Sequence, residues 1–198
     1  MSGHSDDEAS WFGGSDDATR ATTEAAIRGA LGAQRDRLTV LWLDVLSDEP
    51  WPADALPALR LAGDRLGRKR RRGISLTLDP RVDEDFEIAQ ALAPFTIGST
   101  GMSDHGDHLW DVNDTGASTA WRLHPTEERA VRSAISDAGG RPDDLVTLSQ
   151  HQLRRRELSY GVVGGTAPGT DRWRPPAAWR AYERTVRLRS GAGACGGL

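Results

Sequence analysis

The segment HLWDVNDTGASTAWRL, residues 108–123, constrains the fold more than any other part of the chain. Two runs in which apolar and polar residues alternate flank the turn signal Asn-Asp-Thr-Gly, and this is the pattern of a β-hairpin. The centre of the chain is therefore predicted to form two antiparallel strands, and the question that follows is which residues face each other.

Two registers are possible for this hairpin. A type I turn followed by a glycine bulge would set Asn113 opposite Ala117, and it would place Trp110 and Trp121 on opposite faces. A two-residue turn at Thr115–Gly116 would instead set Trp110 opposite Trp121. We predict the second register, because a one-residue slip would turn half of the apolar set to water. It collects one largely apolar face: His108, Trp110, Val112, Thr119, Trp121 and Leu123.

Hydrophobic periodicity and capping signals predict the other elements. Helices are expected at 17–35, 52–66, 83–94, 125–137 and 177–188, and strands at 38–46, 74–78, 95–97 and 144–148. The strand at 38–46 is apolar enough to be central, although Asp44 lies inside it. We assign Trp42, Trp110 and Trp121 to the core. The predicted class is α+β, or α/β with an antiparallel edge, built on a single mixed sheet with a central hairpin flanked by helices.

The 198 residues suit one domain with appendages. Charge is unevenly spread: residues 1–19 hold five acids and no Lys or Arg, whereas residues 150–198 carry a net charge of +6. We divide the chain by composition. The expected parts are a disordered acidic tail at 1–16, an α+β domain at 17–160, a Gly/Pro-rich loop at 161–176, and a C-terminal helix with a frayed tail at 177–198.

Acidic residues and histidines gather in SDHGDHLWD. Asp104, His105, Asp107 and His108 are candidate metal ligands, because imidazole and carboxylate groups together suit zinc or iron. This sequence pattern resembles the HxHxDH zinc motif of metallo-β-lactamase-type hydrolases. His105, Asp107 and His108 match its second half, and Ser103 stands where the first His would be. The resemblance implies a metal-dependent hydrolase, although that family continues with a helix and this chain continues with the hairpin.

A basic run, RKRRR, covers Arg68–Arg72 and offers phosphate contacts for a nucleic acid. The sequence pI near 5.7 argues against this partner, because a dedicated nucleic-acid binder is usually basic. Nucleic-acid binding through Arg68–Arg72 is therefore kept as a second alternative, after the hydrolase.

The favoured function is that of a non-catalytic protein-interaction or regulatory protein. We expect no cofactor, and no catalytic residues can be assigned. We also expect no membrane span and no secretory leader, because the chain has no long apolar run. One cysteine, Cys195, fits a reducing cytoplasm. The predicted contact residues for a protein partner are Trp11, Phe12, Trp179 and Arg180.

Overall fold

The structure, a computed structural model, describes residues 9–46, 51–66 and 73–153. These residues form one seven-stranded sheet in the order β3-β2-β4-β5-β6-β1-β7, and each neighbouring pair of strands in it is antiparallel. The predicted α+β class with a central hairpin is therefore confirmed, and the sheet expected to be mixed is antiparallel in the part described.

The strands are β1 (Ser10–Gly14), β2 (Val40–Leu46), β3 (Gly73–Leu78), β4 (Gly98–Met102), β5 (His108–Asn113), β6 (Ser118–Leu123) and β7 (Leu145–Thr147). The helices are α1 (Arg20–Ala33), α2 (Leu56–Leu66), α3 (Asp83–Leu92) and α4 (Pro125–Asp137). Four of the predicted helices are thus found within a few residues of their expected ends.

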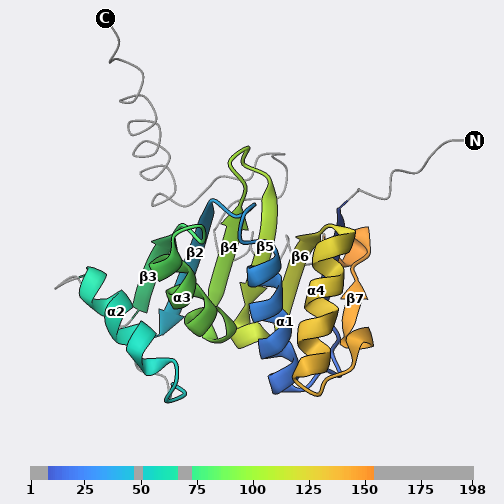
Figure 1. Cartoon of the computed structure of the whole chain (residues 1–198), viewed down its shortest axis with the longest axis horizontal. Helices are drawn as coiled ribbons and strands as arrows, with labels where there is room; N and C mark the ends of the chain where they lie inside the picture. The colour runs from blue at the N-terminus through green and yellow to red at the C-terminus, as the bar shows by residue number, and fades with distance from the viewer. Residues whose placement is uncertain (1–8, 47–50, 67–72, 154–198) are drawn as a thin grey trace, which may run out of the picture. The chain divides into compact units, whose positions relative to one another are not determined.

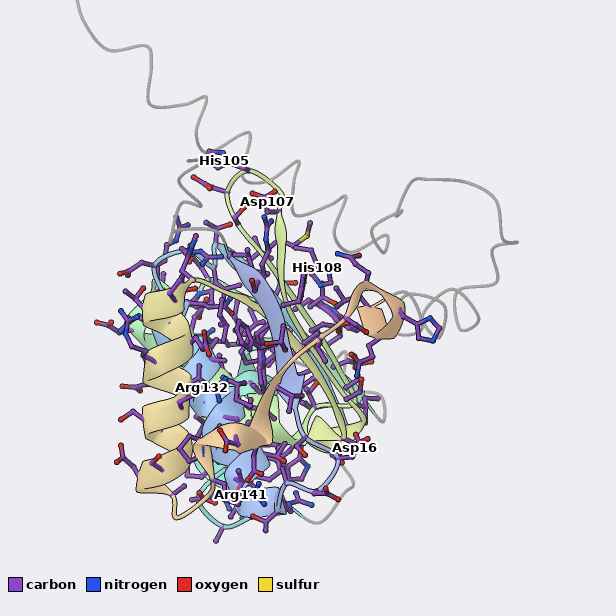
Figure 2. The ribbon with its side chains drawn as sticks, turned by 90° about the vertical axis from the view of Figure 1, so that its right-hand side faces the viewer. Asp16, His105, Asp107, His108, Arg132 and Arg141 are labelled. Atoms are coloured by element: carbon purple, nitrogen blue, oxygen red, sulfur yellow. The ribbon has the colours of Figure 1, made fainter. Side chains whose placement is uncertain are left out.

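All four helices lie on one side of the sheet (Figures 1 and 2). Their apolar residues and those of the facing strands form one buried cluster, in which Trp110 and Trp121 are fully buried and their rings lie 6.0 Å apart. Side chains alternate along a strand, so every second residue points away from this core. We call the side opposite α1–α4 the outer face of the sheet.

The hairpin has the predicted register, with Trp110 opposite Trp121 and Asn113 opposite Ser118. Its turn contains Thr115 and Gly116, both with positive φ, at 55° and 91°. Two successive residues with positive φ are what a type I′ turn requires, and this turn follows the natural twist of paired strands. Thr115 is an unusual choice, because β-branched residues rarely occupy that region.

A bulge corrects the predicted faces of the first hairpin strand. Gly101 pairs with Trp110 but Met102 pairs with His108, so Leu109 is an extra residue in β5. Leu109 therefore joins Trp110 in the buried cluster, while His108 is exposed. The predicted apolar face includes His108, and this part of the prediction is wrong.

Strand β4 is not among the strands expected from the sequence, and the expected strand at 95–97 is wrong. Residues Ala93–Phe95 form a 3-10 turn instead. The composition Gly-Ser-Thr-Gly is not typical of a strand, but the packing around this strand requires glycine. A Cβ at Gly101 would lie 2.8 Å from the Cβ of Trp110 and 2.7 Å from Cδ2 of Leu38, so only glycine lets the large indole fit.

The expectation of a disordered tail at 1–16 is wrong for residues 10–14. They form β1, which lies between β6 and β7, and Phe12 is buried in the core. The strand is short and rich in glycine, so its single buried aromatic residue gave too little periodicity to reveal it. The expected domain at 17–160 therefore begins earlier in the chain than predicted.

Several predicted features lie outside the described residues. These are the basic run Arg68–Arg72, the residues of the domain beyond 153, the loop at 161–176, and the helix at 177–198 with Trp179 and Arg180. Within the described ranges, no helix has both the length and the apolar character that a membrane crossing needs.

Candidate functional site

Three of the candidate metal ligands, Asp104, His105 and Asp107, lie on the loop that joins β4 to β5, and His108 is the first residue of β5. Ser103 organises this loop, because its Oγ accepts hydrogen bonds from the backbone N–H groups of His105, at 3.3 Å, and Asp107, at 3.1 Å. Hydroxyl-to-backbone bonds of this kind are typical of tight turns. The residue that stands where the zinc motif has its first His thus has a local structural role.

The loop does not gather its candidate ligands around one point. His105 Nε2 lies 3.5 Å from Asp104 Oδ1, but the two side chains are 82% and 66% exposed. His105 and Asp107 lie near the end of the loop, and His108 lies further along β5 (Figure 2). The His108 Nε2 atom is 2.9 Å from the carbonyl oxygen of Trp110, which can only accept a hydrogen bond, so this nitrogen carries the proton. Among the described residues, no three His, Cys, Asp or Glu side chains are arranged to hold a metal ion.

A polar hollow of about 510 Å³ lies beside the same loop. Side chains of both charges line it, among them Arg37, Arg81, Asp104 and His105. Two of its three arginines have partners: Arg37 Nη1 lies 2.6 Å from Glu127 Oε2, and Arg81 makes two bonds to the carboxylate of Asp79. The third, Arg122, lines the same hollow as Asp36, Asp104 and Asp107, so the hollow gives no clear preference for a charged ligand.

The outer face of the sheet presents a more specific arrangement. The register sets Trp42, Thr100, Asp111 and Ala120 in one row across four neighbouring strands, with Asp44, Gly98, Asn113 and Ser118 in the row below. Small and polar residues thus occupy the middle of this face. Asp111 and Asn113 are 9% and 8% exposed, and the amide of Asn113 donates to Asp111 Oδ1 at 2.8 Å.

The indole of Trp42 lies over Gly98 on this face, and the glycine makes this position possible. A Cβ at Gly98 would lie 3.3 Å from Cζ3 of the Trp42 indole, so the ring covers the backbone of β4. The indole N–H donates to Ser75 Oγ on β3, at 2.8 Å. Trp42 remains half-buried and stands outside the buried cluster, so its assignment to the core was wrong.

Asp44 follows Trp42 on the same face and is partly buried. Burial raises the pKa of this carboxyl above its ordinary value, because removal from water disfavours the charged form. Within the described part of the chain, no hydrogen bond or ion pair of this side chain offsets that desolvation. A positive charge placed beside Asp44 would therefore be favourable.

The second tryptophan of the outer face is Trp11. Its register partner is Arg122, and its ring meets that of His108 edge-on at 5.6 Å. Trp11 is half-buried, whereas its neighbour Phe12 is 5% exposed and part of the core. Of the predicted contact pair, only Trp11 is accessible to a partner.

Trp42 and Asp44 are the residues that sequence reasoning missed. A signal existed: Leu41, Leu43 and Val45 alternate with Trp42 and Asp44, which is the period of a strand with two different faces. Because Asp44 lies two positions after Trp42, the two residues share one face of the strand, and a charged residue on that face indicates that it points away from the core.

Comparison with known proteins adds no relative. No protein-family model matches the chain, and no curated protein or solved structure does so either.

Proposed function

We propose that this chain is a non-catalytic protein-binding protein and that it binds its partner with the outer face of the sheet. One observation carries the proposal: two half-buried tryptophans, Trp42 and Trp11, flank a central region of small and polar residues on the face opposite the four helices. Tryptophan is enriched among the residues that dominate protein interfaces, because one rigid side chain buries a large area.

The dimensions of this face suit a polypeptide. Trp42 and Trp11 lie on strands four positions apart in the sheet, and neighbouring strands are about 4.8 Å apart, so these two strands are separated by about 19 Å. That width accommodates an extended segment or a helix of about 10–12 Å diameter. We also propose a cytoplasmic location, which the single cysteine Cys195 supports.

The test places a photo-crosslinking amino acid at one of two exposed positions in the full-length chain. Thr77 is exposed and pairs with Trp42, so it samples the outer face, whereas Arg129 is exposed on α4 and serves as the control. In cells of the native host we expect a discrete protein adduct at position 77 that is absent at position 129. Adding Trp42→Ala should remove this adduct. Equal adducts at both positions, or none at position 77, would refute the proposal.

A further inference from the structure

The residues of the outer face indicate the chemistry of the partner as well as the place where it binds. We propose that it binds an arginine-rich segment of another protein, with guanidinium groups stacked on Trp42 and paired with the carboxylate of Asp44. This inference rests on the proposed function and adds the class of partner.

The first argument is the charge of this face. Asp44 points to it, and within the described residues no hydrogen bond or ion pair engages its carboxylate. Asp111 also points to this face, but it is 9% exposed and accepts a hydrogen bond from Asn113, so it adds negative charge and is not offered as a second arginine site. Arg122 is at the far side of the face, beside Trp11.

The second argument is that Asp44 lies beside an aromatic ring. The indole of Trp42 lies against Gly98, directly opposite Asp44 in the neighbouring strand, and Trp42 is only half-buried. An aromatic face next to a carboxylate is a recognition site for a flat cation, because guanidinium both stacks on the ring and donates paired hydrogen bonds to the carboxylate. Lysine offers neither the planar stacking nor the bidentate geometry.

The third argument is the charge of the chain that surrounds the face. The described residues, 9–46, 51–66 and 73–153, hold 21 Asp and Glu against 11 Arg and no Lys, a net charge of −10. A field of this sign accelerates the encounter with a cationic segment, whereas the contacts at Trp42 and Asp44 select arginine.

The test measures binding of a fluorescent nona-arginine peptide to the full-length protein by anisotropy, with nona-lysine as a probe of equal charge. We expect nona-arginine to bind more tightly than nona-lysine. Asp44→Asn should weaken nona-arginine binding about tenfold, as expected for the loss of one charge-assisted contact. The matched control is Asp137→Asn, which removes the same charge from an exposed position on α4 and should change the affinity less than about twofold.

A third variant, Trp42→Leu, keeps an apolar side chain and removes the aromatic face. It should abolish the preference for arginine over lysine. Equal binding of the two peptides, or equal weakening by Asp44→Asn and Asp137→Asn, would show attraction to net charge alone and would overturn the inference. The photo-crosslinker at position 77 gives a further check when nona-arginine is present. Adducts that form only within the protein itself, and never with the peptide, would also overturn the inference.

The crosslinking experiment separates this inference from the proposed function. If position 77 captures a discrete partner in a manner that requires Trp42, but nona-arginine does not bind, the protein-binding function stands and the arginine-rich partner is excluded. If position 77 captures no partner, the proposed function itself fails.

Discussion

Two glycines show how the surroundings of a residue decide the effect of one methyl group. A Cβ at Gly101 would meet Leu38 and Trp110 at less than 3 Å, whereas a Cβ at Gly32 in α1 has no heavy atom nearer than Gln90 Nε2 at 3.8 Å. Gly101→Ala should lower the free energy of unfolding by about 1–3 kcal/mol. Gly32→Ala should raise it by about 0.5–1 kcal/mol, because alanine favours the helix.

Urea denaturation of both variants measures these changes. The same substitution is made in each, so a general effect of alanine would shift both midpoints in one direction. Opposite shifts are the expected result, and a neutral Gly101→Ala would contradict the packing described for β4.

Asp44 makes the stability of the protein depend on pH. Its pKa is higher in the folded than in the unfolded state, so the folded state binds more protons between the two pKa values. The contribution of Asp44 to stability therefore falls as the pH rises from about 3.8 through its folded pKa, and it stays low above that value. We expect Asp44→Asn to be more stable than the wild type at neutral pH.

Urea unfolding of the wild type and Asp44→Asn over a pH series measures this difference. The gap between them should close as the pH falls below the ordinary aspartate value of 3.8, where both side chains are neutral. The Asp137→Asn variant controls for the loss of one negative charge from an acidic chain. A gap that persists in acid would contradict desolvation as its cause.

The hairpin turn illustrates what can be predicted for a whole element. The strand pattern predicted the register because only one alignment keeps the tryptophans together, and the structure confirms it. The bulge at Leu109 was not predictable from alternation, which assumes one residue per position in each strand. Strand β4 was missed for a related reason: its glycines make room for the indoles of Trp42 and Trp110 on neighbouring strands, and alternation within β4 does not reveal these contacts.

Thr115 offers a test of the turn. A threonine at φ 55° is strained, whereas asparagine tolerates this region and Asn-Gly is the preferred pair for a type I′ turn. Thr115→Asn should therefore raise the free energy of unfolding by about 0.5–1 kcal/mol. Thermal unfolding measures the change, and Thr115→Val provides the comparison, because it keeps the β-branched shape. Equal stability of the two variants would exclude strain at this position.

The placement of the helices could be predicted only in part. Periodicity identified α1–α4, but it did not show that all four cover one side of the sheet. That arrangement depends on the strand order β3-β2-β4-β5-β6-β1-β7, which brings β1 from the start of the chain between β6 and β7. Pairings between such distant segments leave little trace in a local pattern, so the outer face was not visible in the sequence.

Partner binding should stabilise the whole molecule. A ligand that binds only the folded state, at a concentration 100 times its Kd, adds about 2.7 kcal/mol, which for a chain of this size raises Tm by about 5–10 °C. Nona-arginine should raise the Tm of the wild type, and at the same concentration it should raise that of Asp44→Asn by less. Scanning calorimetry with nona-lysine as the reference tests this, and identical shifts with both peptides would contradict selective binding.

Gly98 and Gly101 point to opposite sides of β4, and this separation has an evolutionary consequence. Gly101 makes room for the interior indole of Trp110, and Gly98 makes room for the exterior indole of Trp42. A larger residue at position 98 would lift Trp42 from the sheet while leaving the interior untouched. If the outer face binds the partner proposed above, mutation at this single site would retune that recognition without rebuilding the fold.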